Sequence, residues 1–139
     1  MDEATLARLK DRVLVAAVTN DEVRIWLLHE GTTAPVVVVA RGAASQRHHR
    51  AVLESRANDS RVEDAPYFDE VAGVLSLGSH VVLVGHGHGE SNAAIRFREH
   101  VSVHRSHLAG KMDIVRLVDL SALTDAQVLA DARSAWGRR

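Results

Sequence analysis

The chain has 139 residues, which is the size of one domain with a buried core of its own. Hydrophobic residues make up 46% of it and charged residues 25%, as in ordinary globular proteins. The formal net charge of -1 excludes a global attraction to nucleic acid, so any such binding has to come from a local basic patch.

The composition also limits the chemistry and the location. The chain has no cysteine, which excludes disulfides, Cys-ligated zinc and thiol catalysis. The N-terminal sequence MDEATLARLKDR is too charged for a signal peptide, and no apolar run is long enough to span a membrane. We therefore expect a cytoplasmic protein without a membrane partner, folded as a single domain over residues 1–139.

Three short apolar runs joined by turn residues come first in the chain. They cover Val13–Val18, Val23–Leu28 and Val36–Val39. The segments between them, Thr19–Glu22 and Gly31–Thr33, have the composition of turns. Because short turns join neighbouring antiparallel strands, these runs predict an antiparallel meander.

A helical period follows the polar stretch Ala43–Asp64. The apolar residues with this spacing are Phe68, Val71, Ala72 and Leu75. Pro66 suits the first turn of such a helix. The polar stretch is longer than a usual connection, so we expect a functional or mobile excursion there, or a helix that extends away from the core.

The rest of the chain alternates strands and helices. We expect a strand over His80–Val84, a helix over about Ser91–His104 and a strand over Asp113–Val118, and the capping box Thr124–Gln127 opens a last helix. The inward positions of these two helices are Ala94, Phe97, Val101, Leu129, Ala132 and Trp136. The order β-β-β-α-β-α-β-α predicts an α/β domain with a mixed sheet, helices on its faces and two parallel strands at the end.

The stretch VVLVGHGHGESN, over residues 81–92, places three glycines and two histidines directly behind a strand. Free amides before a helix can hold an anion. The candidate anion-binding residues are Gly85, Gly87, Gly89, Ser91 and Asn92. The glycine spacing matches neither a P-loop nor a dinucleotide-binding turn, so no cofactor is predicted. The alternative is a plain turn that the glycines allow, with the helix beginning near Ser91 or Asn92.

The histidines raise the question of a metal site. His86 and His88 are at i and i+2, with Glu90 as a further candidate, and the spacing of His100, His104 and His107 places them on one helical face. A metal site needs three or four protein ligands, and no complete set is visible. We therefore predict no metal and solvent-facing His86 and His88. The alternative is a metal-dependent hydrolase that uses His86, His88, His100 and His104.

Basic residues gather in two places. The first cluster follows the third strand and contains Arg41, Gly42, Gln46, Arg47, His48, His49 and Arg50. The second is formed by Arg96, Arg98, Arg105 and Lys111. Such groups can bind RNA phosphates, or they can form an ordinary solvated face.

The segment from residue 81 to residue 121 resembles a known family. A VVLVG strand, a loop and a helix precede HLAGKMDIVRLVDLS. This pattern resembles the middle domain of the eukaryotic and archaeal class I peptide-chain release factor and of Pelota. Release-factor-like proteins of bacteria and archaea, and the family named for attachment to host cells, share it. The resemblance implies a ribonuclease H-like fold, also called translational machinery component-like, and a ribosome or tRNA as partner.

The resemblance also implies where the family's Gly-Gly-Gln loop would lie. That place is occupied here by Arg41–Arg50, which contains Gly42 and Gln46 but has Ala43 and Ala44 in place of a second glycine. Alanine resists the positive φ that glycine allows. We therefore expect a stand-alone release-factor-like domain without peptidyl-tRNA hydrolysis, more a binding module than an enzyme and without a DNA partner. A non-catalytic oligomeric scaffold is a further alternative, and a homo-oligomer is compatible with each of these.

Overall fold

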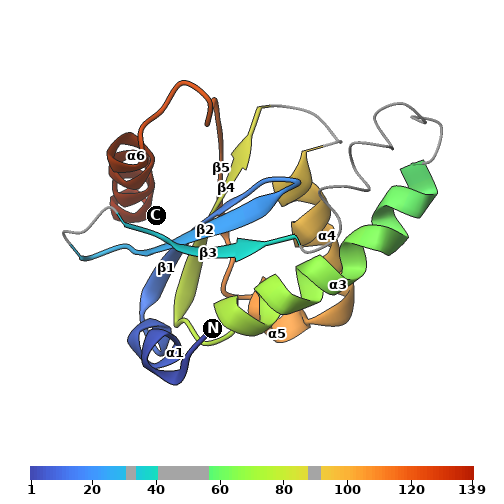
Figure 1. The fold of residues 1–139 in the computed structure, drawn as a ribbon. Helices are drawn as coiled ribbons and strands as arrows, with labels where there is room; N and C mark the ends of the chain where they lie inside the picture. The colour runs from blue at the N-terminus through green and yellow to red at the C-terminus, as the bar shows by residue number, and fades with distance from the viewer. Residues whose placement is uncertain (31–33, 41–56, 88–91) are drawn as a thin grey trace.

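The computed structural model describes residues 1–30, 34–40, 57–87 and 92–139, with the side chains of 57–64 left out. The helices are α1 (Glu3–Leu9), α3 (Ala57–Leu75), α4 (Ala93–His104), α5 (Ser106–Ala109) and α6 (Asp125–Gly137). The strands are β1 (Val13–Val18), β2 (Glu22–Leu27), β3 (Val36–Val39), β4 (His80–His86) and β5 (Ile114–Val118). Figure 1 shows them arranged around one sheet.

The five strands form a mixed sheet in the order β3-β2-β1-β4-β5. β2 is antiparallel to both β1 and β3, whereas β1–β4 and β4–β5 are parallel pairs. This confirms the antiparallel meander and the parallel pairing of the last two strands. It also means that β1, β3, β4 and β5 run in the same direction. Their C-terminal ends meet at one side of the sheet, which we call the carboxyl edge; the opposite side is the amino edge.

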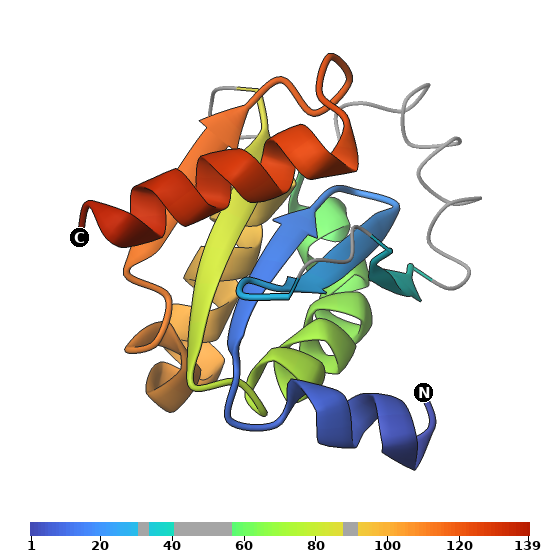
Figure 2. The same ribbon diagram turned by 90° about the vertical axis from the view of Figure 1, so that its left-hand side faces the viewer.

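Helices cover both faces of this sheet (Figures 1 and 2). The helices α3, α4 and α5 pack on one face, and α6 packs on the other. The first face buries Leu14, Ala16, Phe68, Val71, Leu75, Phe97, Val101 and Leu108. The second face buries Val15, Ala17, Trp26, Val82, Val128, Leu129 and Ala132, with Trp136 partly buried against them. Because β1 and β4 are covered on both sides, their sequences are almost continuously apolar.

Polar contacts fasten α6 to the sheet. Arg116 on β5 donates two hydrogen bonds of 2.9 Å to the carboxylate of Asp131 and thereby holds the pKa of that carboxyl below its usual value. Arg133 donates to the backbone carbonyl of Leu28, at 2.7 Å. The predicted capping box of Thr124 and Gln127 is present at the start of α6. The last helix is therefore fixed in position as well as buried.

The structure differs from the sequence-based expectation in several elements, of which three are the clearest. The helix α1 was not predicted, because its seven residues carry no apolar period; the Asp2 side chain caps it by accepting from the Thr5 amide at 2.8 Å. α3 begins at Ala57, so Pro66 lies inside this helix and not in its first turn. β4 continues to His86, because β5 pairs with it beyond Val84.

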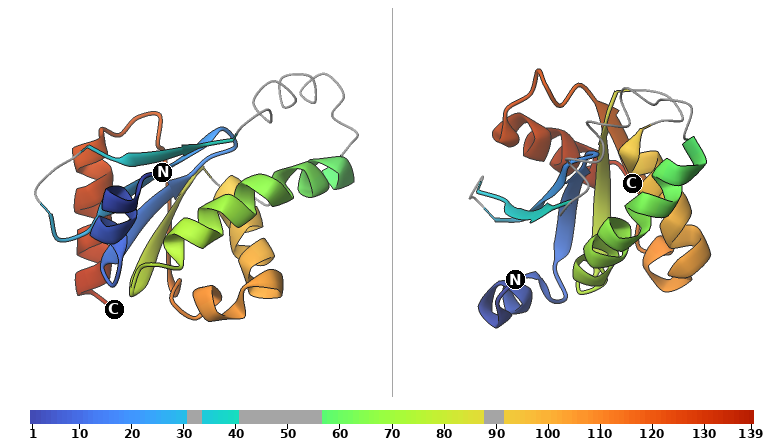
Figure 3. Two further views of the ribbon diagram at one scale, coloured as in Figure 1. Left: turned by 60° about the horizontal axis from the view of Figure 1, so that its bottom comes forward. Right: turned by 45° about the vertical axis from the view of Figure 1, so that its right-hand side comes forward.

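The polar stretch expected as an excursion is only partly described. Residues 57–64 belong to α3, and residues 43–56 lie outside the described residues. In Figures 1 and 3 the N-terminal part of α3 extends beyond the sheet, as the helical alternative predicted. No helix in the described ranges has the length and apolar character needed to cross a bilayer.

Replacing Gly85 with Ala should destabilise the fold. A Cβ at this position of β4 would lie 2.6 Å from Oδ1 of Asn92 and 2.7 Å from the Cβ of Ala94. Such overpacking should lower the free energy of unfolding by about 1–3 kcal/mol, measured by urea denaturation. The control is Gly73→Ala in α3, where a Cβ meets nothing within 4 Å. It should raise stability by about 0.5–1 kcal/mol. Equal effects of the two substitutions would contradict the close approach of α4 to β4.

Candidate functional site at the carboxyl edge

A polar pocket of about 340 Å³ lies at the carboxyl edge of the sheet. Its lining residues are Val18, Thr19, Asn20, Asp21, His86, Asn92 and Ala93. They come from the end of β1, the β1–β2 turn, the end of β4 and the start of α4. Ligands of open α/β sheets bind outside the carboxyl ends of parallel strands, so this pocket has the position expected of a binding site.

The β1–β2 turn is held in one shape by Thr19. Its hydroxyl donates to the carbonyl of Glu22 at 2.9 Å and accepts from the Glu22 amide at 3.2 Å. The carbonyl of Thr19 accepts from the hydroxyl of Tyr67 on α3, at 3.1 Å. This wall of the pocket is therefore held by hydrogen bonds within the turn and by one from α3, which is distant in sequence.

Asn92 fixes the opposite wall. Its side chain donates to the carbonyls of His86 at 2.5 Å and Gly87 at 3.2 Å, and it accepts from the amide of Ala94 at 2.8 Å. The residue is only 6% exposed. The helix thus begins where the sequence predicted, with Asn92 as its N-cap. One side chain ties the end of β4 to the start of α4.

The candidate anion-binding residues do not all lie in one loop. Gly85 lies within β4 and pairs with Leu117. The amide of Gly87, whose φ is 73°, donates to the carbonyl of Val118 at 2.9 Å. Gly87 therefore pairs beyond the end of β4 with Val118, and Asn92 joins the end of β4 to the start of α4. Gly89 and Ser91 lie outside the described residues.

His86 is half-exposed and holds the chain that follows β5. Its Nδ1 accepts from the amide of Leu120 at 3.0 Å, so this nitrogen is unprotonated and Nε2 carries the proton. The Asp119 carboxylate, 3.8 Å from Nδ1, is a neighbour and not an ion-pair partner in that tautomer. A hydrogen bond from Ser121 is the main cause that lowers the pKa of Asp119. His88 lies outside the described residues.

The second basic group is not brought together as one patch. Arg96 donates to Oδ1 of Asn20 and so ties α4 to the β1–β2 turn. Lys111 lies at the amino edge, where its ammonium donates to the carbonyls of Ser76 at 3.2 Å and Gly78 at 3.0 Å. Its role is to satisfy carbonyls beyond the end of α3. Arg98 and Arg105 are exposed on and just after α4.

The first basic group lies in residues 41–50, outside the described residues, but the point from which it departs is described. The amide of Ala40 donates to the carbonyl of Asp21 at 2.9 Å, beside the β1–β2 turn. The chain therefore leaves β3 at the carboxyl edge. It leaves β4 at the same edge, after Gly87. The sheet topology therefore brings the residues that precede segments 41–50 and 88–91 to one side of the molecule.

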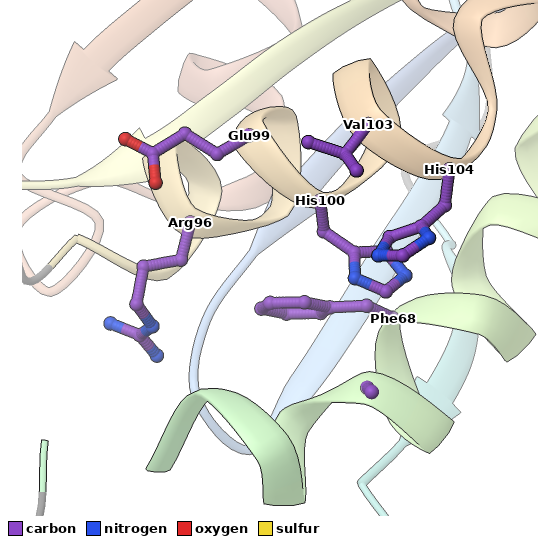
Figure 4. Close-up of a pocket in the computed structure, with 7 residues that line it drawn as sticks. Phe68, Arg96, Glu99, His100, Val103 and His104 are labelled. Carbon is purple, nitrogen blue, oxygen red and sulfur yellow. The ribbon is translucent and has the colours of Figure 1, made fainter. Parts of the chain in front are cut away.

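A groove of about 500 Å³ lies between α3 and α4 (Figure 4). In it, Nε2 of His100 is 2.8 Å from Oδ1 of Asp69, and the ring centroids of His100 and His104 are 4.5 Å apart. α4 ends at His104, so His107 belongs to α5 and does not continue their face. His86 lies at the other end of α4. Among the described residues, no three His, Cys, Asp or Glu side chains are placed to hold a metal ion.

Sequence patterns pointed to some of these residues and missed others. Asn92 was one of the two N-cap candidates, together with Ser91, because N-cap residues follow from local sequence. The contacts of Tyr67 and Lys111 were missed, because their partners, Thr19, Ser76 and Gly78, are distant in sequence. A buried tyrosine needs a partner for its hydroxyl, which is the one signal that predicts such a contact without naming the acceptor.

Comparison with known proteins adds no relative to this picture. The chain matches none of the protein-family models, curated proteins or solved structures with which it was compared. Any functional assignment therefore has to come from the residues themselves and from their arrangement.

Replacing Asn92 with Ala should destabilise the protein. The substitution leaves the carbonyls of His86 and Gly87 and the amide of Ala94 without their partner. Unfolding in urea should show a loss of about 1–3 kcal/mol. Asn92→Ser is the matched variant, because a serine hydroxyl still caps the helix but cannot reproduce both donations of the Asn92 amide. Its loss of unfolding free energy should be smaller than that of Asn92→Ala. If Asn92→Ala unfolds like the wild type, this side chain does not hold the turn.

Proposed function

We propose that the chain is a release-factor middle-domain-like module with a ribonuclease H-like fold, which binds RNA of the ribosome or tRNA without hydrolysing peptidyl-tRNA. Two features support the fold. An antiparallel meander is followed by helical crossovers, and β1 lies at the centre of the mixed sheet. This is the element order that the resemblance of residues 81–121 implies. Its extra helices, α1 and α5, lie outside that order and leave the sheet unchanged.

The main support for this proposal is that the two candidate RNA-binding segments both begin at the carboxyl edge. The basic segment 41–50 begins after Ala40, and the segment 88–91, which contains His88 and Gly89, begins after Gly87. Both points lie at the carboxyl edge, on either side of the β1–β2 turn. Arginine and histidine side chains beside backbone amides are suited to phosphate oxygens. A ligand that spans both segments would be an extended polyanion, and RNA has that chemistry.

The composition of the segment 41–50 and of β1, and the positions of the histidines, support binding without catalysis. Ala43 and Ala44 stand where the resembling family needs glycine backbone freedom. The central strand β1, VLVAAV, carries no carboxylate, whereas a nuclease built on this fold by analogy would need one there for a metal pair. The two histidines at the groove of α3 and α4 lie on a separate element from His86. The geometry therefore favours a binding module over a hydrolase.

The proposal predicts salt-dependent binding through the first basic cluster. Arg41, Arg47 and Arg50 replaced together with Ala should weaken binding to tRNA or ribosomes at least about tenfold at low salt. The slope of log affinity against log salt should fall in magnitude by about 2–3, because up to three phosphate contacts are lost. Fluorescence anisotropy with tRNA and co-sedimentation with ribosomes measure the two partners separately.

The matched control removes three positive charges from the amino edge. Lys10 and Arg12 precede β1, and Arg138 follows α6, whose Trp136 ring contacts the ring of His80 at the start of β4. The triple Ala variant at these positions should bind RNA like the wild type. Equal losses in the two triple variants would mean that only total charge matters. Wild-type binding that is absent, or that does not respond to salt, would overturn the proposal.

A further inference from the structure

The strand β3 forms an outer edge of the sheet and consists of four valines in succession (Figure 3). Val38 is buried in the core, while Val37 is 45% exposed and Val39 is 52% exposed. Natural edge strands are usually protected from pairing by short length, charged side chains, proline or a bulge. β3 is short and Pro35 precedes it, but none of its own four residues is charged or proline. Two exposed valines on an edge strand without charged residues therefore call for an explanation.

Exposed apolar side chains concentrate at this edge. Within the described part of the chain, the large hydrophobic residues that are exposed are Met1, Val37, Val39 and Val103. The first three line one groove of about 570 Å³ between α1, β3 and α3. Val103 lies apart from them, on α4. Apolar side chains gathered on one surface are a feature of interaction sites.

The backbone of β3 is arranged to accept another strand. The amide of Ala40 donates to Asp21 on the side of β2, so alternation in an antiparallel ladder turns Val38 and Val36 toward β2 as well. The N–H and C=O groups of Val37 and Val39 then point away from the sheet. No hydrogen bond between described residues reaches these two from outside the β2–β3 pair. The edge offers four backbone groups with the geometry of strand pairing.

We propose that β3 pairs antiparallel with β3 of a second copy of this chain, about a two-fold axis at Val38. In this register Val37 lies opposite Val39 of the partner subunit, and Val39 opposite Val37 of the partner subunit. All four outward backbone groups are then used, and each exposed valine gains a cross-strand valine as its neighbour. The two five-stranded sheets become one continuous sheet.

A second copy fits this edge better than an unrelated strand. Four identical side chains make the edge self-complementary, as an isologous two-fold interface requires. The groove beside it carries both signs of charge, Arg8 together with Asp2 and Glu70, so two copies do not face a field of one sign. Because the pairing segment is short, the interface falls in the small, weak class, and the dimer should be in equilibrium with monomer.

Analytical ultracentrifugation over a range of concentrations tests the association. The weight-average mass should rise above the monomer value of 15.1 kDa as the concentration increases. Val37→Lys combined with Val39→Lys should keep the mass at the monomer value, because lysine at an edge opposes pairing. Val103→Lys is the control, since it changes an exposed valine on α4 and should associate like the wild type. Circular dichroism checks that every variant is folded.

A cysteine test reports on the register. The chain has no cysteine of its own, so Val38→Cys introduces a single thiol. Val38 is 4% exposed in the monomer, yet the proposed axis places the two copies of this side chain opposite each other. Under mild oxidation Val38→Cys should form a covalent dimer faster than Val103→Cys, whose position is 77% exposed. A monomer at all concentrations, or faster crosslinking through position 103, would overturn the proposal.

Discussion

The parallel pairing of β1 with β4 is the constraint on which the other features of the structure depend. Six residue pairs, from Val13 opposite His80 to Val18 opposite Gly85, join the N-terminal meander to the C-terminal crossovers. Both strands are buried on both faces, so the pairing also divides the apolar core into its two layers. A shift of this register by one residue would turn every side chain of the shifted strand to the opposite face of the sheet. The position of the carboxyl edge follows directly from it.

The chemistry of that edge is a consequence of close approach. Gly85 lacks a side chain, so the first turn of α4 can lie directly against β4. Asn92 then bonds to two carbonyls and one amide at once, and Thr19 fixes the facing turn. These polar groups are used within the fold. What the edge offers to a partner is its pocket and the two segments that leave from it, which is why the proposed function depends on their common origin.

Much of this architecture follows from local sequence. Alternating and continuous apolar runs predicted the strands, a period of 3.6 predicted the inward faces of the helices, and a capping box predicted the start of α6. The predictions failed where the decisive partner is distant in sequence, or where a helix carries no apolar period. Glycine at position 85 indicates a turn locally, yet pairing with Leu117 keeps it in a strand. The start of α3 and the whole of α1 lack an apolar period, and the contact between Lys111 and the end of α3 exists only in the folded chain.

Amide hydrogen exchange with and without tRNA shows directly whether RNA binds at the carboxyl edge, as we propose. We expect slower exchange, on adding tRNA, in residues 19–21, in residues 41–50 and in residues 86–92. Exchange at the amino edge, in Gly78–Ser79 and Lys111–Met112, should stay unchanged. Protection confined to the amino edge or to the exposed face of α6, with none at the carboxyl edge, would contradict the account.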